Sequence, residues 1–458
     1  MNTNMKVGLG EKIGYGFGDL ACNLIFSTAT SYLMYYYTDI AGLTAASVAT
    51  LFLVARIWDA INDPIMGMIV DKTNTRFGKF RPYILFGSVF LAIFAFLCYV
   101  VPTNMSLGGK LIYAYITYIG LGMSYTLVNL PYSALTSAMS NDSEERTKIT
   151  TVRMIFAVLS GVVVAQVWNL VDIFGKGNET VGYRYTTAIM GVVSIILFAI
   201  CFFSTKERVY IDNNKKEEKK HSLKEEFSSI LLNPPLIIIT IVFMLILICG
   251  FVIAGVNIYF FKYNVQRADL ITPAMTLTTL STAIGMFTVP YVTKLFGKKK
   301  AGIITLSMFG LLNLLFFINY KTLNSIPLYF VIIVISGIFN SYTWSLGWSM
   351  LPDTIEYAEY KVGFRAEGLI YSMYSFGQKM GMALAGLISG QILAFVGYKA
   401  NDLQQTQFAL DGIAFLRGGV PFILCIASII IISFYPLTEK KYLQILDELN
   451  KRKSIEQN

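Results

Sequence analysis

The segment 54-VARIWDAINDPIMGMIVD-71 places two aspartates and one arginine in a run that otherwise has the apolar composition of a membrane-spanning helix. Asp59 and Asp63 are four residues apart and Arg56 precedes Asp59 by three, so on a helix all three side chains share one face. A charged side chain at the centre of a bilayer costs at least about 2.5 kcal/mol. We therefore expect the three to face the interior of a helix bundle.

The composition of the whole chain predicts such a bundle. The 458 residues are 55% hydrophobic and 14% charged, with a mean hydropathy of +0.58. Soluble domains carry about a quarter charged residues, so these charges are too few to cover a soluble surface. Apolar runs of about 20 residues, enough to cross a bilayer, recur along the chain. We predict an all-α integral membrane protein with twelve transmembrane helices over residues 13–37, 44–70, 83–101, 110–137, 150–172, 185–204, 234–262, 271–293, 301–319, 326–350, 367–395 and 412–435.

Lysine and arginine are concentrated in every second connection between these spans. The basic connections are 71–82, 141–148, 206–227 and 297–300, whereas 102–109 and 320–327 carry one lysine or none. Because basic short loops stay on the cytoplasmic side, we expect a multi-pass protein of the cell membrane with both termini in the cytoplasm. The N-terminus lacks a secretory-signal pattern. The net charge of +9 follows from this loop bias, so we expect a lipid bilayer and no nucleic acid as partner.

Several classes of active site are excluded by what the chain lacks. The cysteines lie singly inside predicted spans and are interpreted as apolar filler; they are Cys22, Cys98, Cys201, Cys249 and Cys425. The single histidine, His221, lies in the central polar segment, so neither a histidine metal cluster nor a histidine-based triad can form. No Gly-Lys pair is followed by Ser or Thr, which excludes the phosphate-binding loop of ATP-driven proteins. We expect no enzyme and no cofactor.

The polar segment 206–227 divides the spans into two sets of six. Leu130-Pro131 and Leu351-Pro352 occupy matching places in the two sets, each followed by an Arg and a Glu. Two six-helix halves predict the major-facilitator fold, with a substrate site between the halves near mid-membrane. The predicted domains are residues 1–205, 206–232, 233–437 and 438–458, namely the two halves, the cytoplasmic loop between them and a cytoplasmic tail.

Polar residues inside the spans are the candidate sites. Two carboxylates such as Asp59 and Asp63 can bind Na⁺ through oxygen, or one can bind a proton; a purely structural Arg–Asp cluster is the alternative. Carboxylates, amides, Arg and Lys can share the hydroxyls of a sugar, and indole rings stack on its faces. For Trp344 and Trp348 the alternative is helix packing. The candidate sugar-binding residues are Asp19, Asn23, Tyr125, Asn129, Ser133, Arg153, Trp344 and Lys379.

Six segments carry a resemblance to a known family. They are 14-GYGFGD-19, 34-MYYYTDIAG-42, 51-LFLVARIWDAINDP-64, 75-TRFGKFRP-82, 126-TLVNLPY-132 and 353-DTIEYAEYKVGFRAEG-368. With these segments the chain resembles the glycoside-pentoside-hexuronide:cation symporters of the major facilitator superfamily over essentially its whole length. It is similar to the melibiose carriers in the second span, and more closely similar to the glucuronide and xyloside carriers elsewhere.

The resemblance implies a cation site. In the melibiose carriers the aspartates matching Asp59 and Asp63 bind the coupling cation with a threonine matching Thr126 and a third aspartate. Asn129 stands at the position of that third aspartate, which weakens Na⁺ coordination and favours a proton.

The resemblance also implies a sugar site with departures. The family's sugar-binding aspartate falls at Asn23, one turn after Asp19, and its stacking tryptophan falls at Ser133. Arg153, Trp344 and Lys379 match sugar-pocket residues. The departures argue against melibiose, and a β-glucuronide or a β-xyloside fits a pocket that has lost acidic groups.

The resemblance thus implies a bacterial symporter that imports a glycoside, pentoside or hexuronide with H⁺ or Na⁺ and functions as a monomer. An uncoupled sugar facilitator or a drug exporter of the same fold stays open as an alternative. The basic loop 71–82 resembles the facilitator loop motif that latches the two halves. The residues assigned to structure or gating are Arg56, Asp71, Arg76, Lys79, Arg81 and Glu367.

Overall fold

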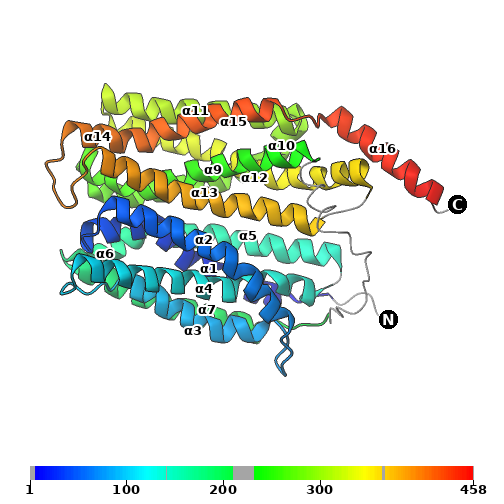
Figure 1. Ribbon diagram of the computed structural model, residues 1–458, viewed down its shortest axis with the longest axis horizontal. Coiled ribbons are helices and arrows are strands. Elements are labelled where there is room, and N and C mark those ends of the chain that lie inside the picture. Colours follow the sequence, from blue (N-terminus) through cyan, green and yellow to red (C-terminus); the bar gives the residue numbers. More distant parts are fainter. Residues whose placement is uncertain (1–5, 141, 210–231, 364–366, 457–458) are drawn as a thin grey trace. The chain divides into compact units, whose positions relative to one another are not determined.

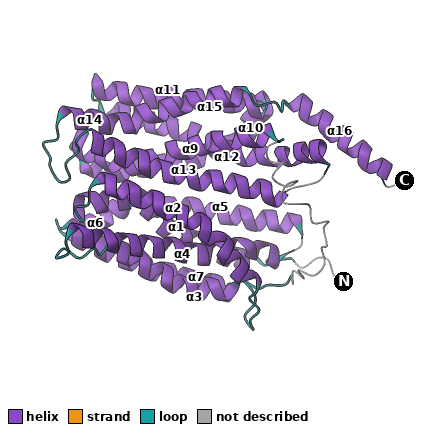
Figure 2. Cartoon of the chain, viewed as in Figure 1, coloured by secondary structure: helices purple, strands orange, loops and turns teal. Residues whose placement is uncertain are grey.

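The computed structural model describes the chain except for residues 1–5, 141, 210–231, 364–366 and 457–458 (Figure 1). The described residues are helical apart from turns and loops, and contain a single isolated β-bridge between Thr75 and Gly78 (Figure 2). The all-α prediction is therefore confirmed. His221 and most of the central polar segment lie outside the described residues.

The chain forms two compact units. Unit 1 comprises Met1–Lys215, Asn257–Thr279 and Ser389–Ala409, and unit 2 comprises Lys216–Val256, Leu280–Ile388 and Leu410–Asn458. The predicted domain boundaries stay a prediction. The elements that lie in unit 1 are α1 (Leu9–Tyr35), η1 (Tyr36–Ile40), α2 (Ala45–Asp71), α3 (Arg81–Cys98), α4 (Leu107–Met139), α5 (Ser143–Ala165), α6 (Val167–Gly175), α7 (Glu179–Ser204), η3 (Phe260–Asn264) and η4 (Ala268–Leu270).

Other helices belong to unit 2 or run from one unit into the other. Those in unit 2 are α11 (Lys298–Lys321), α12 (Ile326–Val362), η5 (Phe415–Gly419), α15 (Val420–Ser433) and α16 (Glu439–Glu456). Those that cross a unit boundary are α9 (Pro234–Tyr259), α10 (Ile271–Phe296), α13 (Glu367–Phe395) and α14 (Gln407–Ala414).

Helix length and apolarity agree with twelve membrane spans. Among the described residues, 10 helical segments are long and apolar enough to cross a membrane. The long helices α1 and α13 are not among them, and their 27 and 29 residues supply the remaining two predicted spans. All five cysteines are buried and free, in agreement with their interpretation as filler.

Helices α12 and α4 each continue through an internal proline. Helix α12 continues through Pro352 to Val362, well beyond the predicted span end at residue 350, and α4 continues through Pro131 to Met139. In a membrane bundle, neighbouring helices and hydroxyl side chains can satisfy the backbone groups that a proline frees. The tail after residue 438 forms helix α16, on which Ile445 and Leu449 are buried.

Helix α1 is the centre of unit 1 and packs against α5 and α7. The rings of Tyr15 on α1 and Tyr132 on α4 stack with centroids 4.5 Å apart. Each of these tyrosines also donates its hydroxyl to the other's backbone carbonyl, at 3.0 and 2.8 Å. Because both hydroxyls find partners, two large rings can be buried here without an unsatisfied polar atom. This pairing fixes α1 against α4 beside the candidate site.

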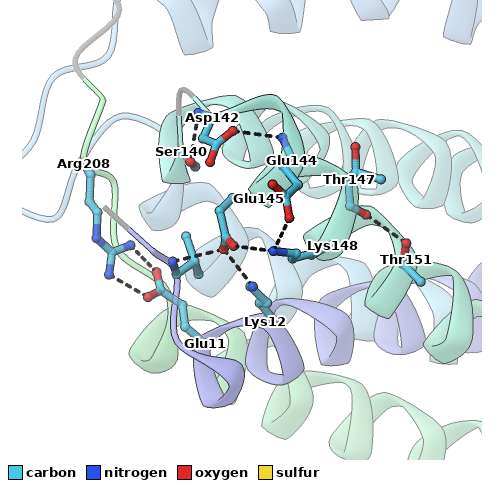
Figure 3. A network of polar contacts seen from close by, with 11 residues as sticks. Glu11, Lys12, Ser140, Asp142, Glu144, Glu145, Thr147, Lys148, Thr151 and Arg208 are labelled. Atoms are coloured by element: carbon cyan, nitrogen blue, oxygen red, sulfur yellow. Dashed lines mark hydrogen bonds and ion pairs between the residues drawn. The ribbon is translucent and has the colours of Figure 1, made fainter. Parts of the chain in front are cut away.

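A network of ion pairs joins the start of α1 to the start of α5 and to the segment that follows α7 (Figure 3). Lys12 contacts Glu145 at 2.7 Å, and both are largely buried. Arg208, which follows α7, donates two hydrogen bonds of 2.7 Å to Glu11. These bonds raise the pKa of Arg208. The network holds the start of α1 against α5 and against the segment after α7.

The carboxylate of Glu207 shapes the basic loop. It accepts hydrogen bonds from the backbone N–H groups of Lys79, Phe80 and Arg81 at 2.8, 2.8 and 3.1 Å. A carboxylate is favourable at this place because the first N–H groups of a helix lack partners within the helix. Gly78 adopts a φ of +106°, and a Cβ there would lie 2.4 Å from Glu207 Oε1, so the loop needs glycine at this position.

Candidate functional site

The first charged cluster of unit 1 is centred on Asp59 of α2, of which only 6% is exposed. Arg56 Nη1 lies 2.9 Å from Asp59 Oδ2, and Arg56 Nη2 donates to the hydroxyl of Tyr118 on α4 at 3.1 Å. The guanidinium lies 5.7 Å from the ring centre of Phe26 and 5.9 Å from that of Tyr118. Aromatic faces stabilise a cation that has left water. The two charges are therefore held together in an aromatic enclosure.

A small cavity of about 20 Å³ adjoins this pair. A space of this size with polar partners can hold one water molecule, or one bare cation of similar size, next to Asp59. Its lining residues are Ile25, Phe26, Ala29, Ala55, Arg56, Asp59, Tyr118, Leu121, Gly122 and Tyr125.

The second cluster lies one helical turn further along α2. Thr126 on α4 donates its hydroxyl to Asp63 Oδ1 at 3.0 Å. Asp59 lies opposite Gly122 on α4, so the two helices meet in two layers, Asp59 with Gly122 and Asp63 with Thr126. Carboxylate and hydroxyl oxygens are ligands for hard cations such as Na⁺ and acceptors for a proton. The described residues hold no group of three or more His, Cys, Asp or Glu side chains placed to share a metal ion.

Three residues around Asp59 were missed by the sequence reasoning. Tyr118 contacts Arg56, Gly122 faces Asp59, and Asn62 is only 4% exposed. The amide nitrogen of Asn62 is buried without a hydrogen-bond partner among the described residues, which marks it as a candidate ligand-contacting group. Its spacing of three residues from Asp59 was the signal available in the sequence. Tyr118 and Gly122 gave no such signal.

Gly122 gives a direct test of the Asp59 site. A Cβ at this position would lie 2.5 Å from Asp59 Oδ1, so the carboxylate must move. We expect Gly122→Ala to weaken cation binding about tenfold, with a smaller effect on sugar binding. The measurement is the cation dependence of sugar uptake in vesicles. Gly67→Ala, at a position on α2 where a Cβ meets nothing within 4 Å, is the control. Equal effects of both changes would contradict a role of Asp59 in cation binding.

The third cluster joins α1 to α5. Arg153 Nε donates to Asp19 Oδ1 at 2.7 Å, and Asn23 Nδ2 donates to Asp19 Oδ2 at 3.1 Å. The Arg153 guanidinium also lies 5.3 Å from the ring centre of Tyr132. Asp19 is 4% exposed, whereas 28% of the Arg153 side chain is exposed. Arg153 is therefore anchored by Asp19 and still has N–H groups that can meet a ligand.

The other predicted sugar residues of unit 1 lie around these clusters. Tyr125 stacks on Phe26 with ring centroids 5.0 Å apart, beside the Asp59 cavity. Asn129 is half-buried and Ser133 is exposed. The structure thus brings Asp19, Asn23 and Arg153 into one cluster and Tyr125 into another.

Two predicted sugar residues belong to unit 2. Trp344 on α12 meets the rings of Phe243 and Phe251 edge-on at 6.4 Å, and it lies against Gly250. Lys379 is half-buried on α13. Their part in a sugar pocket stays a prediction.

Three predicted gating residues of the basic loop have contacts that the structure describes. The Arg76 guanidinium lies 4.7 Å from the ring centre of Phe77, and the Lys79 ammonium 5.4 Å from that of Phe80. Arg81 donates to the carbonyl of Phe202 at 2.7 and 3.2 Å. Asp71 is the last residue of α2, and Glu367 is the exposed first residue of α13. Their gating role stays a prediction.

A family model described as MFS/sugar transport protein matches residues 14–439. The chain belongs to this family. It is 41% identical to the "Uncharacterized symporter YnaJ" of Bacillus subtilis (strain 168), covering 98% of this chain and 96% of that protein. It is 35% identical to the "Glucuronide carrier protein homolog" of Escherichia coli (strain K12), covering 99% and 98%.

The solved structures show the same fold. A D-xylose-proton symporter is 13% identical and superposes with a TM-score of 0.66 over 92% of this chain and 96% of that one. The major-facilitator fold and the resemblance to the glycoside-pentoside-hexuronide:cation symporters are thereby confirmed. The chain is a multi-pass membrane transporter and not an enzyme.

Proposed function

We propose that this chain is a secondary active symporter that imports a glycoside, pentoside or hexuronide together with a monovalent cation. Both termini lie in the cytoplasm of a bacterial cell, and one chain suffices for transport. The observation that carries the proposal is the pair of neighbouring polar clusters inside unit 1. In one, Asp59 is paired with Arg56 and Asp63 accepts a hydrogen bond from the hydroxyl of Thr126. In the other, Arg153 is paired with Asp19. Because a charged group inside a membrane is energetically costly, such groups commonly mark the pathway of a substrate or an ion.

The donor set favours H⁺ over Na⁺ as the coupling ion. Na⁺ needs several oxygen ligands, as other hard cations do. One oxygen of Asp59 is already bound to Arg56, and the residue at position 129 supplies an amide in place of a carboxylate. A proton needs only one acceptor oxygen, which a carboxylate such as that of Asp59 can supply.

The exposed part of Arg153 favours a substrate with a carboxylate or with hydroxyls placed to accept N–H groups. A guanidinium binds a carboxylate through two parallel hydrogen bonds. A β-glucuronide supplies that group, and a β-xyloside would use hydroxyl oxygens at the same place. The similarity to a glucuronide carrier homolog supports testing the first.

The test is sugar-triggered ion movement in lightly buffered, de-energised vesicles that contain the protein. Methyl-β-glucuronide, xylobiose and melibiose are added separately, with and without Na⁺. Alkalinisation of the external medium on addition of one sugar is the expected result, and it identifies the ion and the sugar class together. Stimulation of sugar uptake by Na⁺ without a pH change would identify Na⁺, and not H⁺, as the coupling ion.

The same experiment separates the symporter from an uncoupled sugar facilitator or a drug exporter of the same fold. A facilitator would take up labelled sugar with no response of either ion, and Asp59→Cys would leave that uptake unchanged. An exporter would show no uptake of any of the three sugars. Recovery of chemically unchanged sugar inside the vesicles completes the test.

A further inference from the structure

A buried carboxylate that the transport sites do not use lies at the other end of α1. Asp39 is in η1, a short π-helical segment that continues α1 at the end of unit 1 opposite Glu11 and Lys12, and 2% of it is exposed. Its Oδ1 accepts hydrogen bonds from the hydroxyls of Tyr263 and Tyr398, the latter at 2.7 Å. Thr38 donates to Oδ2 at 2.6 Å. Three hydroxyl donors therefore satisfy this carboxylate in place of water.

The donors come from distant parts of the sequence. Tyr263 lies in η3, a second π-helical segment, and Tyr398 follows α13. The backbone carbonyl of Asp39 accepts a hydrogen bond from Asn401, and the hydroxyls of Thr38 and Tyr259 share a hydrogen bond of 2.8 Å. The short segment η1, from the first half of the sequence, is thus hydrogen-bonded to two segments from the second half, one around η3 and one after α13.

A charged cluster beside Asp39 joins the same segments. Tyr35 donates to Glu179 Oε2 at 2.6 Å, and Lys262 of η3 forms an ion pair with Glu179 Oε1 at 3.0 Å. Lys262 also contacts the hydroxyl of Tyr35. The ring of Trp168 on α6 meets Tyr35 edge-on at 5.6 Å.

Two further hydrogen bonds extend the junction along α10. Thr272 donates to Asn169 at 3.0 Å, and Gln166 donates to Thr276 at 3.1 Å. Together with the bonds of Tyr398 and Asn401 to Asp39, these contacts tie Asn257–Thr279 and Ser389–Ala409 to unit 1, although both segments come from the second half of the sequence. The junction is polar, and water can replace each of its hydrogen bonds, so the net gain of each is modest. A polar junction of this kind can open and close.

The geometry points to a gate. We propose that Asp39 and its hydroxyl donors form the extracellular gate of the transporter, closed in this structure, and that breaking the bonds to Asp39 admits sugar from outside. The proposal rests on the proposed function, because the orientation of the chain and alternating access come from it. The π-helical segments η1 and η3 both carry gate residues. Such segments are frequent at functional sites, and here they carry Asp39 and Tyr263, which are hydrogen-bonded to each other.

The test measures access to a position below the gate. Ser31 on α1 is 8% exposed and lies two turns before Asp39. Ser31→Cys is made in a background without the five native cysteines, and intact cells are treated with a membrane-impermeant maleimide. We expect Asp39→Asn to increase the labelling rate at least tenfold. Tyr398→Phe removes one donor only and should increase it about threefold.

The control is Asp269→Asn. Asp269 is an exposed residue of the same unit that pairs with the equally exposed Arg267, so its change should leave labelling as in the parent. If Asp39→Asn does not reach the membrane, Tyr398→Phe and Tyr263→Phe decide the matter. If the parent protein takes up sugar but labelling is unchanged in the folded variants, the gate proposal is wrong. Absence of sugar uptake by the parent would instead count against the proposed function.

Discussion

Asp59→Asn is expected to abolish accumulation of sugar against its gradient, reducing it by about 100-fold or more. Asp59 is buried, it is the carboxylate of the first cluster, and it lines the small cavity. An amide neither binds a proton at neutral pH nor supplies the charge that balances a cation. The change also leaves the partly buried Arg56 without its carboxylate, and removing one partner of a fully buried pair costs about 3–5 kcal/mol, which is an upper bound here. The measurement is ion-driven uptake in energised vesicles.

A double variant separates coupling from folding. Arg56→Gln combined with Asp59→Asn removes both charges, so thermal stability should largely recover relative to Asp59→Asn. Coupled uptake should not recover, because the carboxylate is still absent. Recovery of coupled uptake in the double variant would show that Asp59 acts only as the structural partner of Arg56. Downhill exchange of sugar, which needs no ion gradient, checks that the protein reaches the membrane in folded form.

Arg153→Gln is expected to weaken sugar binding by about 100-fold. Arg153 is the cation of the α1–α5 cluster, and its exposed N–H groups are the donors that we assign to the substrate. Neutralising it removes those donors and leaves Asp19 buried without its ion-pair partner. Equilibrium binding of the sugar identified in vesicles measures the effect. Arg184→Gln, at an exposed position on α7, is the matched control.

Asp19→Asn distinguishes an anchor from a ligand. If Asp19 only positions Arg153, this change should weaken binding less than Arg153→Gln does, and a neutral xyloside and an anionic glucuronide should be affected alike. A selective loss of the glucuronide in Arg153→Gln alone would establish the contact with the carboxylate. Equal affinity of Arg153→Gln and the parent protein would remove Arg153 from the sugar site.

The helices were predictable because a bilayer demands them. The spacing of apolar runs located the long helices, and the four-residue spacing of Asp59 and Asp63 placed both carboxylates on α2. The tenth predicted span ended at residue 350, just before Pro352, whereas α12 continues to Val362, although local propensity disfavours proline inside a helix. In the folded chain, tertiary packing supports the helix through Pro352.

The pairing of the polar side chains was not predictable from spacing along one helix. Spacing placed Arg56, Asp59 and Asp63 on one face of α2, but it could not show that Arg56 pairs with Asp59 or that Thr126 of α4 donates to Asp63. Gly122 could not be recognised, because its importance lies in the Cβ that it lacks beside Asp59. Asp39 and Tyr263 are 224 residues apart in sequence, and only the fold brings them together.

Because Trp168 contacts Tyr35, tryptophan fluorescence can report the opening of the proposed gate. The chain contains four tryptophans, and two of them, Trp58 and Trp348, are substantially exposed. Trp168 is buried, and its ring rests on the tyrosine that binds Glu179 and Lys262. Its emission should therefore shift when the gate opens to water, whereas the emission of the two exposed tryptophans should change little. The protein thus carries an intrinsic fluorophore beside the proposed gate.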